Sequence, residues 1–322
     1  MTDRSAAAPA PETATAPTAE PGARLALPLL LAGAVGIGFA PIFVRLASEA
    51  GVDPVASAFW RMALATPLLG LSAAWVARAN AARRGPPPDG ALPAPGHRRG
   101  LVFMIAAGLF FAADLSLWHW SITLTSVANA TLLTNLSTVF VPLFGFFVLG
   151  QRFRGSYLAG VVLALGGAAL LVGLSLDLGG TRPLGDLLGV ATAVMYTGYF
   201  LSTAAARRYV STPVTVLAVT GGAALALLPV AILSGDNFWP TSAIGWAPLI
   251  GVALISQVAG QGLIIFAVRH LPPAFTVVSL LIQPLVAALV AWVLFGEALG
   301  PVELAGGAMV LMGILLARRG AR

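Results

Sequence analysis

Two charged residues lie inside long apolar stretches of the sequence. Asp114 lies in "GLFFAADLSLWHWSIT" (108–123), and Arg61 lies in "FWRMALA" (59–65). A charge in the middle of a bilayer costs at least about 2.5–3.5 kcal/mol, so such residues need a partner or a function. Arg61 could bind a carboxylate, and Asp114 could bind an amine or a proton. The alternative is a structural ion pair between the two side chains.

Other polar residues recur at helical spacing. In "ATLLTNLSTVFVPLF" (130–144) four polar residues fall at i, i+3, i+4 and i+7, on one helix face. Stripes of this kind on several segments favour a polar cavity over simple interhelical packing, in which each hydrogen bond contributes about 0.6 kcal/mol. We expect the following residues to bind a substrate: Trp60, Arg61, Asp114, Trp118, Thr131, Asn135, Thr138, Tyr196, Tyr199, Gln257, Gln261 and Gln283. His119 falls off the face of Asp114 and Trp118, and we interpret it as a packing residue.

The composition indicates an all-α integral membrane protein. Of 322 residues, 58% are hydrophobic and 9% are charged, far from the roughly 25% charged residues of soluble domains. There are no cysteines, so disulfides and thiolate metal sites are excluded. We expect no cofactor and no metal site.

The apolar stretches predict ten membrane-spanning helices, because each is close to the roughly 20 residues that cross a bilayer. Their ranges are 25–46, 54–78, 101–122, 126–150, 155–175, 184–205, 212–233, 243–267, 272–295 and 301–317. Residues 1–24 read as a disordered cytoplasmic tail, and residues 79–100 as a flexible cytoplasmic loop.

The arginines indicate the orientation of these helices. With both termini in the cytoplasm, the inner side carries fifteen of them, whereas Arg45 and Arg182 lie outside. The net charge of +6 therefore reflects membrane topology, and we expect no nucleic-acid partner.

The sequence repeats itself after a shift of 146 residues. Gly150 then lies over Gly296, Gln151 lies over Glu297, and "LAG" at 158–160 lies over "LAG" at 304–306. The repeating units are 25–175 and 184–318, each with five helices. Because five is odd, the two copies have opposite orientations, which is typical of transporters with a binding site between the repeats.

The chain resembles the EamA family of the drug/metabolite transporter superfamily. The resemblance rests on the ten spans, the repeated unit, "FWRMALA" and the paired "LGQR" and "FGEAL" segments. The family usually has Glu at both of the latter positions, and here the first is Gln151. The resemblance implies an inner-membrane permease, and many members export amino acids, metabolites or drugs.

We therefore expect a secondary transporter, an exporter of small metabolites such as amino acids or amphipathic drugs, that works by alternating access. The expected partners are a small-molecule substrate and the lipid bilayer, for a monomer or a weak homodimer. Proton coupling stays open: an Asp114–Arg61 ion pair would keep the carboxylate ionised, whereas separated side chains would let Asp114 carry a proton. One alternative is a sugar-phosphate or nucleotide-sugar antiporter, which would need clustered basic residues. A membrane-embedded enzyme is the other, but no GxSG or HExxH motif is present.

Overall fold

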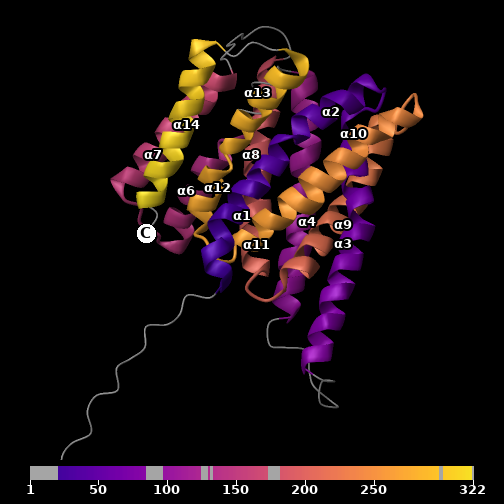
Figure 1. Ribbon diagram of the computed structural model, residues 1–322, viewed down its shortest axis with the longest axis horizontal. Helices are drawn as coiled ribbons and strands as arrows, with labels where there is room; N and C mark the ends of the chain where they lie inside the picture. Colours follow the sequence, from indigo (N-terminus) through magenta and orange to yellow (C-terminus); the bar gives the residue numbers. More distant parts are fainter. Residues whose placement is uncertain are drawn as a thin grey trace, which may run out of the picture.

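The computed structural model describes residues 21–84, 97–124, 130, 133–172, 182–296 and 300–320, and the regular elements in these ranges are helices (Figure 1). Helical structure is expected in a bilayer, because a helix satisfies its own backbone hydrogen bonds without water. The helices are α1 (Pro21–Gly38), α2 (Ala40–Glu49), α3 (Pro54–Arg84), α4 (His97–Leu124), α6 (Ser137–Leu149), α7 (Gly155–Val172), α8 (Arg182–Ala206), α9 (Thr212–Ser234), η1 (Ala243–Gly245), α10 (Trp246–Gly251), η2 (Val252–Gln261), α11 (Gly262–Ala267), α12 (Pro273–Ser279), α13 (Ile282–Phe295) and α14 (Pro301–Gly320).

Seven helical segments of the described chain are long and apolar enough to cross a membrane. They are Arg24–Glu49, Pro54–Ala79, Arg98–Ser121, Pro183–Ala206, Thr212–Ser234, Ala243–Ala267 and Pro273–Leu294. Their outward side chains are apolar: Trp75 is 71% exposed and Leu233 is 87% exposed. Exposed apolar surface on this scale needs a lipid solvent. The protein is therefore a multi-pass membrane protein, and the full set of ten spans stays a prediction.

The start of α1, the facing ends of α3 and α4 and the C-terminal end of α14 lie toward the lower part of the molecule in Figure 1. The end of α2 and the start of α10 lie at the opposite, upper end. Paired arginines lie at two helix ends: Arg98 and Arg99 in the first turn of α4, and Arg318 and Arg319 in the last turn of α14.

Helices α7 and α14 pack closely and antiparallel. A Cβ added at Gly160 would lie 2.6 Å from the Gly313 carbonyl oxygen, and one at Gly313 would lie 2.7 Å from the Gly160 oxygen. Further along, a Cβ at Gly167 would lie 2.5 Å from the Gly306 oxygen. The 146-residue shift relates Gly160 to Gly306 and Gly167 to Gly313, so the two contacts exchange equivalent residues. Such a reciprocal contact is what a pseudo-two-fold axis produces.

The first helix of each half of the sequence packs against helices of the other half. Helix α1 packs against η2 and α11, and α8 packs against α4. Between α1 and η2, the Ser256 hydroxyl donates a hydrogen bond of 2.9 Å to the Gly36 carbonyl oxygen. Between α4 and α8, the Ser121 hydroxyl donates one of 2.7 Å to the Gly185 carbonyl oxygen. Each of these helices therefore buries its inner face against the other half.

Four backbone irregularities interrupt the helices near the centre of the bundle. The α1–α2 chain breaks at Phe39, shortly before Pro41, and the α12–α13 chain breaks at 280–281, shortly before Pro284. A proline removes a backbone donor and clashes with the carbonyl four residues earlier, which accounts for both breaks. A turn at 135–136 precedes α6, and η2 is a π-helix of ten residues. Short π-helical segments are rare and often occur at functional sites.

A loop clamp, residues 50–56 with residues 236–241, joins the two halves at the upper end. The Asp53 amide donates to the Asn237 carbonyl oxygen at 3.0 Å, and the Asn237 amide donates to Asp53 Oδ2 at 2.8 Å. The Ala56 amide donates to Asp236 Oδ2 at 2.9 Å. Burial raises the pKa of the Asp236 carboxyl above its usual value; the Ala56 amide works against that rise, and the nearby Asp53 charge adds to it.

Candidate functional site

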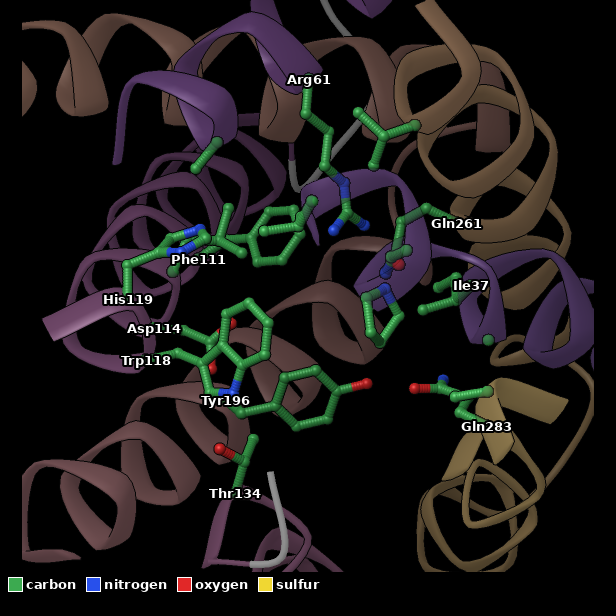
Figure 2. A pocket seen from close by; sticks show the side chains of 18 of the residues that line it. Ile37, Arg61, Phe111, Asp114, Trp118, His119, Thr134, Tyr196, Gln261 and Gln283 are labelled. Carbon is green, nitrogen blue, oxygen red and sulfur yellow. The ribbon is translucent and has the colours of Figure 1, made fainter. Parts of the chain in front are cut away.

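A cavity of about 150 Å³ lies at the centre of the bundle, between helices of both halves. Its wall includes Arg61 from α3, Asp114 from α4, Tyr196 from α8, Gln261 from η2 and Gln283 from α13 (Figure 2). The wall is mostly apolar, with these few polar groups converging on the space, which is the usual composition of a small-molecule site.

Irregular backbone supplies much of the polar wall. Gly38 and Ala40 flank the break at Phe39, and Thr134 and Asn135 lie at the turn before α6. Gln283 and Pro284 follow the α12–α13 break, and Gln261 ends the π-helix. Interrupted helices near the membrane midplane are a recurring way for transporters to direct polar groups at a substrate.

Arg61 points into the cavity from α3 and is anchored from behind. Its side chain is 9% exposed, and its Nε donates a hydrogen bond of 3.1 Å to Gln257 Oε1. Gln257 is fully buried and donates through Nε2 to the Thr220 hydroxyl oxygen at 2.9 Å. Gln257 therefore lies behind Arg61 and off the cavity wall.

Asp114 lies on the wall without an ionic partner. It is 5% exposed, and within the described chain its Oδ1 has no hydrogen-bond partner. Asp114 and Arg61 both lie in the described part of the chain and form no ion pair with each other, unlike Arg45 and Glu49, which pair at 3.2 Å on the surface. The structural ion pair that the sequence left open is therefore absent in this structure. Both charges remain available to a ligand.

The floor of the cavity is built from stacked rings and a buried hydrogen bond. Phe111 stacks on Tyr199, with ring centroids 4.5 Å apart. Gln261 Nε2 donates to the Tyr199 hydroxyl oxygen. Tyr199 is 1% exposed and contacts Gln261 from behind the wall. Tyr196, by contrast, lines the cavity itself.

His119 also lies on the wall, although its spacing puts it off the face of Asp114 and Trp118. It is 2% exposed, and within the described chain its Nδ1 has no hydrogen-bond partner. Leu115, one turn before His119, also lines the cavity, but an apolar residue in an apolar span gives no sequence signal for this face. The arc of α4 that faces the cavity is wide enough to include both i+4 and i+5 from Asp114. Asn135 Nδ2 is a further buried atom of the wall without a partner in the described chain.

The structure brings together seven of the residues predicted from the sequence: Arg61, Asp114, Trp118, Asn135, Tyr196, Gln261 and Gln283. Tyr199 and Gln257 lie behind the wall. Thr138 is buried, and its hydroxyl donates to the Asn135 carbonyl oxygen at 2.8 Å. Thr131 lies outside the described residues.

Trp60 lies in a separate aromatic cluster under the loop clamp. Its ring centroid is 5.0 Å from that of Trp246 and 5.5 Å from that of Trp239. Its Nε1 donates a hydrogen bond of 2.7 Å to the Phe238 carbonyl oxygen. Trp60 therefore joins α3 to the α9–η1 loop and does not line the cavity.

The comparisons with known proteins agree with this architecture. The model of the EamA-like transporter family matches residues 24–173 and, separately, residues 183–319. The chain belongs to the EamA-like transporter family. The resemblance seen in the sequence is thereby confirmed, and the protein is a membrane transporter.

Two curated relatives of this chain are named as transport proteins. One, from Streptantibioticus cattleyicolor, is named "Probable terminal-alkyne amino-acid exporter" and is 30% identical over 207 residues, or 63% of this chain and 68% of that protein. The other, from Archaeoglobus fulgidus, is named "Uncharacterized transporter" and is 29% identical over 197 residues, or 61% and 68%. A solved crystal structure with 20% identity covers 92% of this chain and 98% of its own at a TM-score of 0.72, a likeness of fold alone.

Proposed function

We propose that this EamA-like transporter exports small zwitterionic metabolites, above all amino acids with apolar side chains, from the cytoplasm across the inner membrane. The observation that carries this proposal is the central cavity, whose wall holds Arg61 and Asp114 without a bond between them. A carboxylate at Arg61 and an ammonium at Asp114 would satisfy both charges at once.

The rest of the wall suits an apolar substrate side chain. Ile37, Pro41, Val44 and Leu115 line the cavity, and the rings of Trp118 and Tyr196 face it. The Streptantibioticus cattleyicolor relative is named as a probable exporter of a terminal-alkyne amino acid, and an alkyne is an apolar group. A phosphate group would need several cations, and Arg61 is the one arginine among the described wall residues. These points favour an amino acid over a sugar phosphate.

The mechanism that we propose is alternating access between two inverted five-helix repeats in a ten-helix bundle. The two separate matches to the family model support a duplicated unit. The reciprocal, antiparallel glycine contacts of α7 and α14 support an inverted relation between the copies.

Counterflow in proteoliposomes tests the function. Purified protein is reconstituted in liposomes loaded with unlabelled L-norleucine, and uptake of labelled L-norleucine is followed. The same vesicles are tested with n-pentylamine, which lacks the carboxylate, and with hexanoate, which lacks the ammonium. We expect exchange of norleucine in chemically unchanged form, and poor exchange of both analogues. A failure of all three compounds to exchange, or chemical conversion of norleucine, would contradict the proposal.

Cysteine labelling tests the orientation, because the chain contains no native cysteine. Ala91→Cys lies in the loop predicted to be cytoplasmic, and Ser242→Cys lies on the exposed segment beside the loop clamp. A membrane-impermeant maleimide should label only Ser242→Cys in intact cells. Labelling of both from outside would exclude the inverted arrangement.

A further inference from the structure

Gln257 is bonded on both ends of its side-chain amide. Its Oε1 accepts from Arg61 Nε at 3.1 Å, and its Nε2 donates to the Thr220 hydroxyl oxygen at 2.9 Å. Gln257 and Thr220 are both fully buried. The relay therefore runs from α9 through η2 to α3, and it ends at the charged group that points into the cavity.

This relay leaves one orientation for the amide. An arginine Nε can only donate, so the oxygen end of Gln257 must face Arg61. The nitrogen end then needs an acceptor, and Thr220 provides one. The orientation of the guanidinium is fixed through Nε, while Figure 2 shows its terminal nitrogens directed into the cavity. Neither terminal nitrogen has a hydrogen-bond partner in the described part of the chain.

The neutrality of the amide matters for the ligand. A glutamate at this position would form a buried ion pair with Arg61 and neutralise its positive charge. The glutamine positions the guanidinium by a hydrogen bond and does not neutralise it. A buried, anchored and unbalanced guanidinium is a site for an anion. Its two terminal nitrogens match the two oxygens of a carboxylate.

We propose that Gln257 is the specificity-determining residue of this transporter, because it positions Arg61 without neutralising it and thereby selects substrates that carry one carboxylate. Thr220 is a positioning residue that orients Gln257. This inference rests on the proposed function and deepens it, because it says which residue makes the cavity prefer an amino acid over an amine.

The test compares two ligands that differ only in the carboxylate. Dissociation constants for L-norleucine and n-pentylamine are measured on the full chain in lipid nanodiscs, for wild type and for Gln257→Glu. We expect the preference for norleucine over pentylamine to fall by about ten- to a hundredfold in Gln257→Glu, because the new carboxylate occupies Arg61. Pentylamine should bind as in wild type or more tightly. A change in overall stability would not shift this ratio.

Two further variants separate the bond from the charge. Gln257→Met keeps the Arg61 charge but removes the anchor, and Thr220→Val removes only the second bond of the relay. The ratio should fall in both, less than in Gln257→Glu and least in Thr220→Val. They also carry the test if Gln257→Glu does not fold. A folded Gln257→Glu or Gln257→Met with the wild-type ratio would overturn the inference.

The inference and the proposed function fail in different ways. If wild type binds neither norleucine nor hexanoate, the carboxylate site is absent and both are overturned. If wild type binds norleucine in preference to pentylamine and the Gln257 variants keep that preference, the transporter assignment stands and the role of Gln257 is overturned.

Discussion

Among the described residues two arginines are buried, and they use their hydrogen-bond donors differently. Arg207, which follows α8, is 3% exposed and donates from Nε to the Ile265 carbonyl oxygen at 3.3 Å and from Nη1 to the Val210 carbonyl oxygen. Arg61 is 9% exposed and has one such bond, from Nε to Gln257. Arg207 joins the turn after α8 to α11, whereas Arg61 keeps its terminal nitrogens for the cavity.

This comparison shows how a structural cation differs from a binding one. Burial, together with the nearby Arg269 charge, lowers the pKa of the Arg207 guanidinium to about 10. Arg207 lies outside the spans, and backbone carbonyl groups satisfy it. Arg61 lies within a span, and its remaining donors have no acceptor among the residues that the structure describes. Both arginines are buried. What distinguishes the binding residue Arg61 from the structural residue Arg207 is that the terminal nitrogens of Arg61 have no hydrogen-bond acceptor in the described chain.

Arg207→Met should have the largest effect on stability. Two carbonyl groups lose charged donors, each of which contributes about 1.5–3 kcal/mol, so we expect a loss of about 3 kcal/mol or more. Thermal unfolding of the purified protein measures it. The fraction that stays folded should keep the wild-type preference for norleucine over pentylamine. An unchanged melting temperature would remove the contrast between the two arginines.

Arg61→Met should have the opposite profile. The fold loses one hydrogen bond to Gln257, so the melting temperature should stay within a few degrees of wild type. Norleucine exchange should fall by about a hundredfold, because a two-pronged charged contact is lost. Counterflow measures it, with Arg207→Met as the matched control. Unfolding of Arg61→Met with no folded fraction would show that this arginine, too, is structural.

Asp114→Asn should fold, because the structure shows no ion pair for it to break. We expect norleucine to bind about tenfold or more weakly, since the ammonium loses its counter-charge, while hexanoate binds as before. The same variant tests coupling: if Asp114 carries a proton, exchange should lose its response to a pH gradient. Wild-type affinity together with a wild-type pH response would show that Asp114 has neither role.

His119→Phe should weaken norleucine binding by about tenfold or less. The ring keeps its apolar contact with Trp118, but the wall loses a polar atom that has no partner in the described chain. His119→Asn should restore part of the affinity. His270→Phe, at the turn after α11, is the matched control and should bind normally. Equal affinities in all three variants would return His119 to a packing role.

The smallest effect that we expect is on the loop clamp. The raised pKa of Asp236 means that the folded state binds a proton more tightly than the unfolded state, so this carboxyl lowers stability as the pH rises above about 4. Asp236→Asn should therefore melt above wild type at pH 7, and the difference should shrink toward pH 4. Melting curves over this pH range measure it. A difference that grows on acidification would reverse the sign.

The sequence predicted the helices and much of the wall, because both depend on local patterns. The length of an apolar stretch predicts a membrane span. Polar residues at helical spacing predict the face of each helix that carries Tyr196, Gln261 or Gln283. The helix breaks are harder to predict from the sequence. Pro41 and Pro284 do follow interruptions, but α6 continues through Pro142 and its break comes earlier, at 135–136. The π-helix has no local signal in the sequence.

The roles of individual polar residues depend on contacts between distant segments. Gln257 and Gln261 are one turn apart and alike in sequence, yet one anchors Arg61 and the other faces the cavity. Their partners separate them: Gln257 bonds to Thr220, 37 residues away, whereas Gln261 bonds to Tyr199, 62 residues away. Trp60 and Arg61 are adjacent, yet the tryptophan packs under the loop clamp. No spacing rule contains this information.

The exchange of helices between the two halves has a consequence for how this protein assembles. Helix α1 completes the core of the second half, and α8 completes that of the first. On its own, each half would expose two surfaces: the face of its first helix that packs against the other half, and the part of its own core that the other half's first helix covers. Under the inverted arrangement that we propose, it can bury them only against a second half in the opposite orientation. A protein with one such repeat would then need to form an antiparallel pair to be stable.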